Sequence, residues 1–340
     1  GVPAEHAATT AMRLVDADLR GRTGHGLIRL TSYVQRIRAG GMNPRPVIAV
    51  THETPVSAQI DGDNGLGQVV MTRAAELAIA KAAASGVAWV GTVRSNHAGA
   101  AGLYAQMAAD AGLIGVYFAV ANANGMPPWG GIDPLLGTNP VAIAVPTKDT
   151  PFVLDIATTA TSHGSIKVAA REGKAMPTGW MVDAEGQPIT DPARAHEGFL
   201  VPMGGYKGSG LTIAIGLLAG VLNGAAFGAE VVDHRSDDVT PTNTGQSFLA
   251  LRADLFRPVD EVIADFTSHL DAIRASRSRD GSGIRLPGDE AARVYAENTE
   301  LGVPVGAALV ADLGALAQEF GIESSFGERR SHATGHISMR

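Results

Sequence analysis

The stretch from residue 87 to residue 122 constrains the fold most, because short apolar runs there alternate with a helical segment. VAWVGTV and LIGVYFAVAN are predicted strands, and between them lies a small-residue segment with helical spacing, AGAAGLYAQMAADAG. A Rossmann domain built on such a unit carries the fingerprint G-x-G-x-x-G, which this chain lacks. We therefore predict an α/β (α+β) chain with a non-Rossmann fold and a central mixed or antiparallel sheet.

Composition indicates a globular chain and excludes several classes of function. Of 340 residues, 45% are hydrophobic and 18% are charged, which suits a protein with an ample core. The formal net charge of −7 argues against a partner such as nucleic acid, whose phosphates attract basic proteins. The chain has no cysteine, so disulfides, thiolate zinc sites and cysteine nucleophiles are excluded. Cysteine usage is compatible with the cytoplasm, where we expect the protein to reside.

No membrane or targeting segment is predicted. The apolar segment LTIAIGLLAGVL is 12 residues long, well below the ~20 residues of a membrane span, and we expect it to form a buried helix. The first residues, GVPAEHAATT, lack the basic and apolar regions of a signal peptide.

The domains are predicted to interleave along the chain. Helical spacing near both ends predicts a domain of terminal helices, formed by residues 1–60 and 285–325. Residues 61–284 would form the cofactor-binding domain with the substrate cleft, and residues 326–340 a polar tail. HRSDDVTPTNTG and SRSRDGSG are predicted to be surface loops.

A histidine lies between the first predicted strand of the unit above and the helix that follows it. His97 follows Ser95 and Asn96, and we place it in the first helical turn, where the helix dipole disfavours imidazolium. A histidine that is neutral at pH 7 can act as a general base. A packed or capping histidine fits the sequence equally well, and the same two interpretations apply to His163.

A second pattern combines an imidazole, a guanidinium and a phenol. His25, Arg29 and Tyr33 are spaced i, i+4, i+8, so one helix starting near Gly26 would place them on one face. These three side chains on one face could bind an anionic small molecule, because arginine forms bidentate hydrogen bonds with a carboxylate. The spacing alone equally describes a solvated helix face.

Two glycine-rich loops are the remaining candidates. GDNGLG (residues 62–67) and GGYKGSG (residues 204–210) match neither the Rossmann nor the Walker pattern, and plain turns account for both. The second opens a helix, so its N–H groups and Lys207 could together face an anion. His332 and His336 are interpreted as solvent-exposed, and no metal site is predicted.

Several long motifs occur in an order that resembles a known family. They include DADLRGRTGHGLIRLTSYVQRI, SNHAGAAG, PWGGIDPLLGTNPVAIAVPT, VLDIATTATSHG, VAAREGKAMPTGW, DAEGQPITDP and VPMGGYKGSGL. Together they resemble the type 2 malate/L-lactate dehydrogenase family, from Gly1 to about Phe320. That family also contains ureidoglycolate and sulfolactate dehydrogenases and reductases of cyclic imino acids. The resemblance is specific for the family and much less so for the substrate.

The resemblance implies a cofactor, an assembly and roles for single residues. It implies NAD or NADP, with NAD favoured, on a non-Rossmann fold, and a homodimer with a small carboxylate substrate. It assigns proton transfer to His97 and the substrate site to His25, Arg29 and Tyr33. Cofactor contacts carry over to Asn122, Asp155, Ile156, Ala157 and Lys207, with the loop after Arg285 as a weaker candidate. It also implies a short helix before Gly1.

The chain departs from the family's pattern at two places near the substrate. The usual D-S-H-G is Thr23-Gly24-His25-Gly26 here, so a serine hydroxyl beside His25 is lost. The stretch ANANGMPP lacks an acidic residue that some relatives have, which disfavours substrates with a cationic or donor group there.

The sequence thus predicts an enzyme that moves a hydride between nicotinamide and C2 of a small 2-hydroxy or 2-oxo acid. Two alternatives stay open. One is reduction of the C=N bond of a cyclic imino acid on the same fold. The other is a catalytically silent ligand-binding relative, which the change at Gly24 permits.

Overall fold

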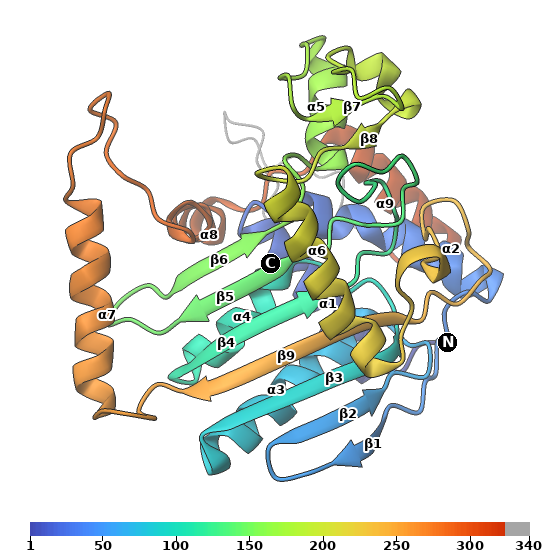
Figure 1. The fold of residues 1–340 in the computed structure, drawn as a ribbon. Coiled ribbons are helices and arrows are strands. Elements are labelled where there is room, and N and C mark those ends of the chain that lie inside the picture. The colour runs from blue at the N-terminus through green and yellow to red at the C-terminus, as the bar shows by residue number, and fades with distance from the viewer. Residues whose placement is uncertain (324–340) are drawn as a thin grey trace.

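A seven-stranded mixed sheet forms the centre of the computed structural model, which describes residues 1–323 (Figure 1). The strand order is β1-β2-β3-β9-β4-β5-β6, and among neighbours only β2 and β3 pair in parallel. The predicted mixed sheet is therefore confirmed. Its strands are β1 (Ala49–Glu53), β2 (Ser57–Asp61), β3 (Val87–Ser95), β4 (Leu113–Ala119), β5 (Val141–Val145), β6 (Phe152–Ile156) and β9 (Thr244–Arg252), and a separate pair consists of β7 (Met181–Val182) and β8 (Phe199–Leu200).

The helices form where the sequence has helical spacing and end mostly at glycine. Gly40 and Gly173 adopt left-handed backbone conformations directly after their helices, where residues with a Cβ are disfavoured. The α-helices are α1 (Ala4–Leu19), α2 (Leu30–Ala39), α3 (Gly67–Ser85), α4 (Ala101–Asp110), α5 (His163–Glu172), α6 (Tyr206–Ala219), α7 (Val259–Arg274), α8 (Asp289–Leu301) and α9 (Ala307–Glu319).

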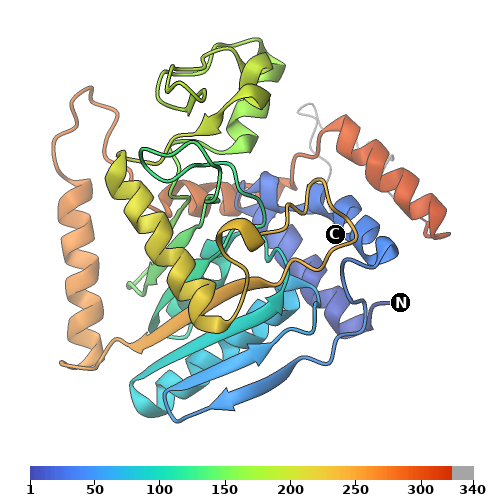
Figure 2. The same ribbon diagram turned by 45° about the vertical axis from the view of Figure 1, so that its right-hand side comes forward.

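Helices α3 and α4 cover one face of the sheet, and α6 crosses the other (Figures 1 and 2). Alanines let α3 approach the strands closely, and four of them are fully buried: Ala74, Ala75, Ala78 and Ala82. The approach of α4 depends on a glycine in β4, since a Cβ at Gly115 would lie 2.5 Å from the carbonyl oxygen of Ala105. This side of the sheet holds the main core.

The strand directions bring several chain segments together at one end of the sheet, where the carboxyl ends of three strands lie. β9 lies between β3 and β4 and is antiparallel to both, so β3 and β4 run the same way. β6 also shares their direction, because β5 is antiparallel to both β4 and β6. The carboxyl ends of these three strands therefore meet at the edge where β9 begins, next to α1 and α2 (Figure 1).

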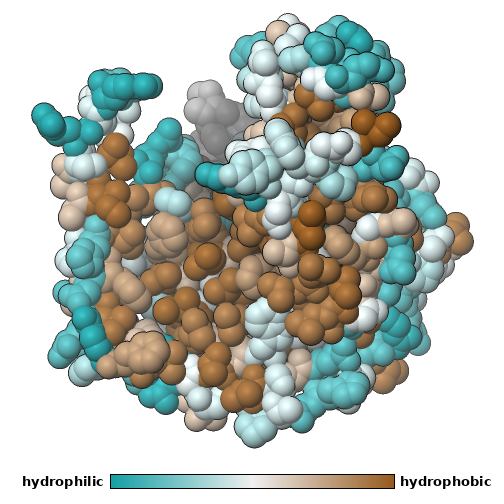
Figure 3. Space-filling view, viewed as in Figure 1, coloured by the Kyte–Doolittle hydropathy of each residue, from teal (hydrophilic) through white to brown (hydrophobic). Residues whose placement is uncertain are grey.

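The apolar segment LTIAIGLLAGVL was predicted to form a buried helix, but one side of it is exposed. It forms most of α6, which contacts β4 and β9 along one side only. On its outer side Leu217 is 48% exposed, and Leu222 just beyond the helix is 64% exposed. Apolar side chains dominate this face of the molecule (Figure 3). Within residues 1–323, no segment covers the outer side of this helix, although that side is apolar too.

The terminal helices pack on the sheet's helical layer and on one another. α1 contacts α3 and α8, and α2 contacts α9. The predicted division into domains stays a prediction, and the predicted polar tail, with His332 and His336, lies outside the described residues. No helix within residues 1–323 is long and apolar enough to cross a membrane.

Candidate active site

Residues from three separate segments meet beyond the carboxyl end of β3. His97 follows β3, and its Nδ1 lies 2.6 Å from the Tyr33 hydroxyl of α2. The ring of His25 stacks on that of His97, with centroids 5.7 Å apart and planes 7° apart. Arg29 is close enough for its charge to lower the pKa of His97. The structure thus brings all four candidates for catalysis and substrate binding together.

His25, Arg29 and Tyr33 do not share one helix, as their spacing had suggested. α2 begins only at Leu30, and two short 3₁₀ turns precede it. A buried carboxylate bends the chain here, because Asp18 Oδ2 accepts a hydrogen bond from the Leu27 N–H at 2.8 Å. The approach requires glycine at position 26, where a Cβ would lie 2.0 Å from Asp18 Oδ1. The bend turns His25 towards His97.

The prediction that His97 lies in the first turn of a helix is wrong, because α4 starts only at Ala101, after an irregular segment. The helix dipole is therefore not what keeps its ring neutral. Burial lowers the pKa of His97 well below its usual range, and the positive charge of Arg29 adds to this effect. His234 and His25 contribute in the same direction.

The backbone around His97 is held firmly by the glycine-rich GDNGLG loop and by β9. Asn96 donates from Nδ2 to the carbonyl oxygen of Gly65 at 2.9 Å, and its own carbonyl accepts from Gln246 Nε2 at 2.9 Å. A Cβ at Gly67 would lie 2.5 Å from the His97 carbonyl oxygen, so this loop packs directly beneath the histidine. Its glycines serve close packing.

His234 is a member of the site that the sequence did not reveal. It lies in HRSDDVTPTNTG, predicted to be a surface loop, yet it is only 9% exposed. Its ring centroid lies 5.3 Å from that of His97, and its Nδ1 is 2.9 Å from the Asn122 carbonyl oxygen. Because a carbonyl only accepts, Nδ1 carries the proton and donates it. A single histidine in a polar loop gives no local signal of this placement.

A buried arginine anchors this loop to α2. Arg36 is 1% exposed and donates to the carbonyl oxygens of Gly41 at 3.0 Å, Thr240 at 2.8 Å and Asp237. It thereby links the helix that carries Tyr33 to the loop that carries His234. Burial lowers the pKa of the guanidinium, whereas the nearby acidic residues oppose that effect.

We expect Arg36→Met to lower the free energy of unfolding by about 2 to 3 kcal/mol, since it leaves buried carbonyl groups without donors. Arg38→Met is the matched control, because Arg38 pairs with Glu319 at the surface and such pairs contribute about 1 kcal/mol or less. Urea denaturation of both variants measures the difference. Equal losses would show that Arg36 does not anchor the loop.

Arg29 presents a guanidinium that lacks an anionic partner among residues 1–323. Its Nε donates to the Gly24 carbonyl oxygen at 2.7 Å, and neither terminal nitrogen has a protein partner within the described chain. The side chain is half-buried, and burial lowers its pKa. A desolvated guanidinium with its fork open is suited to binding a carboxylate.

The neutral histidines of the site predict how stability depends on pH. The pKa of His25 is lowered to about 4, first by the protein packed around the ring and then by Arg29, although part of the residue lies at the surface. Burial also lowers the pKa of His234. Unfolding therefore takes up protons below pH ~6.5, the pKa of a free histidine.

We expect the free energy of unfolding to fall as the pH drops from 7 to 5, by up to about 1.4 kcal/mol per pH unit for the buried ring of His234 and by less for His25, which is exposed to solvent. Denaturant unfolding at several pH values measures this slope, which His234→Asn should reduce. A constant stability over this range would contradict the neutral state of these rings.

The predicted cofactor residues lie at the same edge of the sheet. Asn122 follows β4 and is buried, and its amide donates to the Thr244 hydroxyl at the start of β9. Asp155 and Ile156 end β6, and Ala157 follows them. Asp155 Oδ2 accepts from the Gly102 N–H of α4 at 3.0 Å, whereas Oδ1 has no hydrogen-bond partner within residues 1–323.

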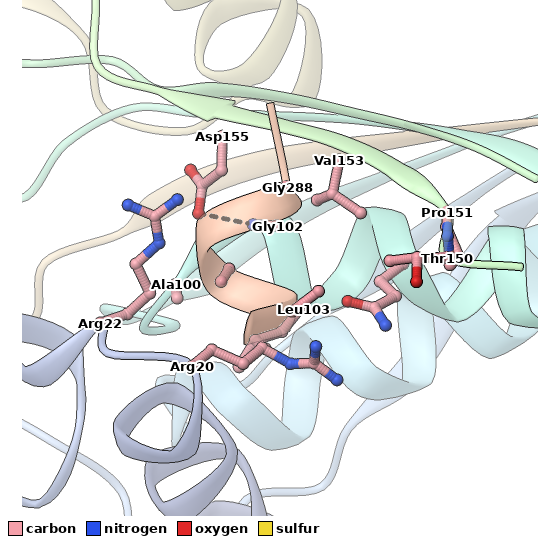
Figure 4. Close-up of a pocket in the computed structure, with 13 residues that line it drawn as sticks. Arg20, Arg22, Ala100, Gly102, Leu103, Thr150, Pro151, Val153, Asp155 and Gly288 are labelled. Atoms are coloured by element: carbon pink, nitrogen blue, oxygen red, sulfur yellow. Dashed lines mark hydrogen bonds between the residues drawn. The ribbon is translucent and has the colours of Figure 1, made fainter. Parts of the chain in front are cut away.

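A hollow lined by Asp155 extends to the loop after Arg285 (Figure 4). Gly288 of that loop faces the start of α4 across it, and Arg20 and Arg22 enter from the end of α1. An acceptor oxygen, two cations and glycine backbone suit the hydroxyl groups and phosphates of a dinucleotide.

Two further predicted residues lie apart from the histidine cluster. Lys207 is exposed in the first turn of α6, after Gly204 and Gly205, whose φ angles are 63° and 68°. His163 begins α5 and packs against Gly125, where a Cβ would lie 3.0 Å from its Nε2. No contact between His163 and His97 is seen in the described structure.

The family described as malate/L-lactate dehydrogenase matches residues 1–314. The chain belongs to this family. Its relatives include a malate dehydrogenase of Pyrococcus horikoshii, 38% identical over 335 residues, covering 95% of this chain and 91% of that protein. An L-sulfolactate dehydrogenase of Methanocaldococcus jannaschii is 41% identical over 290 residues, covering 85% and 83% of the two chains. The solved structure of a sulfolactate dehydrogenase from that organism superposes with a TM-score of 0.89 at 38% identity, covering 95% and 93%.

Other relatives differ in cofactor and in chemistry. A ureidoglycolate dehydrogenase (NAD(+)) of Escherichia coli K12 is 38% identical, covering 75% of this chain and 73% of that protein. A (2R)-3-sulfolactate dehydrogenase (NADP(+)) of Chromohalobacter salexigens is 33% identical, covering 85% and 84%. The structure of Δ1-piperideine-2-carboxylate reductase from Pseudomonas syringae pv. tomato has a TM-score of 0.83 at 29% identity, covering 93% and 94%. The two dehydrogenases are thus named for nicotinamide cofactors, NAD(+) in one and NADP(+) in the other.

Proposed function

We propose that this chain is a nicotinamide-dependent dehydrogenase that interconverts a small 2-hydroxy acid and the corresponding 2-oxo acid. The observation that carries the proposal is the open guanidinium fork of Arg29 beside the neutral ring of His97. One group can bind the substrate carboxylate, and the other can accept the proton of the adjacent hydroxyl group.

Each residue of the site has a separate role in the reaction. Nicotinamide, when bound, supplies or takes up the hydride. Arg29 holds the carboxylate and so places C2 of the substrate. His97 accepts the hydroxyl proton at Nε2 during oxidation and returns it during reduction, because its Nδ1 is occupied by Tyr33. His25 covers the ring of His97 and orients the substrate oxygen.

The bound substrate also adjusts the proton affinity of His97. Arg29 lowers the pKa of His97, and a carboxylate on Arg29 neutralises that charge. The pKa of His97 therefore rises when the substrate binds, which favours transfer of the proton to the ring. This coupling needs no movement of the protein.

We further propose that Asn122, Asp155, Ile156, Ala157 and Lys207 bind the cofactor. The open oxygen of Asp155 can accept hydrogen bonds from ribose hydroxyl groups. Lys207 and the glycine-led start of α6 can face phosphates. Both NAD and NADP suit this set of groups.

The protein is proposed to act as a homodimer. Beside α6, half-exposed apolar side chains line the open face of β4, namely Ile114, Val116 and Phe118. A continuous apolar face of this kind marks an association surface (Figure 3). Light scattering should give about twice the 35.0 kDa of one chain at micromolar concentration. A monomer mass would contradict the proposal.

A second candidate function is reduction of a cyclic imino acid, which the likeness to Δ1-piperideine-2-carboxylate reductase favours. Oxidation of NADH and NADPH, measured with oxaloacetate, pyruvate, sulfopyruvate and Δ1-piperideine-2-carboxylate, separates the two. We expect turnover with at least one 2-oxo acid. Turnover with the imine alone would support the second function, and cofactor binding without turnover across the panel would indicate a silent relative.

A further inference from the structure

Gln68 lies behind the site, and no function has been assigned to it so far. It is the second residue of α3, directly after the GDNGLG loop, and it is completely buried. Its Nε2 lies 2.8 Å from the Tyr33 hydroxyl, and that hydroxyl lies 2.6 Å from His97 Nδ1. Three side chains from α3, α2 and the segment after β3 thus form one hydrogen-bonded row.

The row determines which nitrogen of His97 carries the proton. If Gln68 donates to the Tyr33 oxygen, the Tyr33 proton is directed to His97 Nδ1. The neutral ring must then carry its proton on Nε2, and that nitrogen cannot act as a base. Burial raises the pKa of Tyr33 to about 12, so its hydroxyl keeps its proton over the working range of pH.

The opposite direction of the row leaves Nε2 free. If the oxygen of Gln68 faces Tyr33, the Tyr33 hydroxyl donates to it and can accept from His97 Nδ1–H. Gln68 Oε1 is buried and has no hydrogen-bond partner within residues 1–323. Within the described residues, the Gln68 amide therefore forms a hydrogen bond only with Tyr33. Rotating the amide by 180° about the Cγ–Cδ bond breaks no other hydrogen bond.

We propose that Gln68 is a positioning residue which turns its amide oxygen towards Tyr33 and thereby keeps the proton of neutral His97 on Nδ1. Nε2 is then the basic nitrogen that faces the substrate. When Nε2 takes the hydroxyl proton, the imidazolium retains its Nδ1–H bond to Tyr33, so the row need not change during the reaction. The inference rests on the proposed role of His97.

Gln68→Met tests this assignment because it retains the size of the side chain but cannot accept the Tyr33 proton. Tyr33 then donates to His97 Nδ1 and holds the proton of the ring on Nε2. We expect kcat for oxidation to fall by about 10- to 100-fold with KM changed less than about threefold. ¹⁵N NMR of the histidine rings should show His97 moving from the Nδ1–H to the Nε2–H tautomer.

Two further variants complete the test. Gln68→Glu, whose ionised carboxylate only accepts, should retain the Nδ1–H tautomer and most of the turnover, and it serves if Gln68→Met does not fold. Gln59→Met is the control, because Gln59 donates to the Asn223 carbonyl oxygen and does not contact Tyr33. It should leave the His97 tautomer and turnover unchanged.

The NMR and kinetic results separate the two claims. An unchanged tautomer in Gln68→Met, or an Nε2–H tautomer in both the parent protein and Gln68→Glu, would overturn the role of Gln68. A changed tautomer with unchanged turnover would uphold that role and contradict proton transfer by His97.

Discussion

His97→Gln is expected to lower turnover by about 10² to 10⁴-fold, the usual contribution of a group that transfers a proton. Glutamine approximates the size of the ring but cannot take up the hydroxyl proton. Steady-state kinetics in both directions measure the loss, and a titration of nicotinamide fluorescence should show cofactor affinity nearly unchanged.

His163→Gln is the matched control, because His163 packs against Gly125 away from the Tyr33 and His97 pair. It should turn over at a rate close to that of the parent protein. Normal turnover of His97→Gln would show that His97 only fills space, and His25 would become the better candidate for proton transfer.

Arg29→Met is expected to lower kcat/KM for the oxo acid by about 10² to 10³-fold, because the carboxylate loses its charged, bidentate partner. Cofactor affinity should hardly change. Arg29→Lys should recover only part of the loss, since an ammonium group cannot reproduce the planar fork. Kinetics with a carboxylate substrate and with its amide provide the measurement.

The same variant has a second, independent consequence. Because Arg29 lowers the pKa of His97, Arg29→Met should shift the acid limb of the kcat/KM profile for oxidation to higher pH. Unchanged kinetics and an unchanged profile would show that Arg29 belongs to a solvated helix face.

Local patterns in the sequence predicted the mixed sheet, two of its central strands and the helix α4 between them. Apolar runs identified β3 and β4, and the absent fingerprint argued against the doubly wound fold. The apolar helix α6 was wrongly expected to be buried within the chain. Hydropathy indicates that an apolar surface is unfavourable in water, but it does not indicate whether the same chain or another one covers that surface.

The site was only partly predictable because its geometry depends on contacts between distant residues. His25 turns towards His97 through the bond from Leu27 to the buried Asp18, and no periodic pattern contains that bend. His234 is held by a loop anchored to Arg36, about 200 positions earlier in the chain. Such contacts lie outside the short windows on which sequence patterns act.

For His97, the sequence predicted the neutral state of the ring correctly but attributed it to the wrong physical cause. The sequence predicted a neutral ring from the dipole of a helix that in fact begins four residues later. Burial and Arg29 lower the pKa instead, and both effects exist only once α2 has packed against the end of β3.

The pH dependence of the two reaction directions tests the central claim most directly. With chemistry rate-limiting, turnover should rise with pH for oxidation of the hydroxy acid and fall with pH for reduction of the oxo acid, through one shared ionisation. Both opposed limbs should disappear in His97→Gln. Profiles that move in the same direction, or opposed profiles that survive in His97→Gln at the same midpoint, would contradict proton transfer by this histidine.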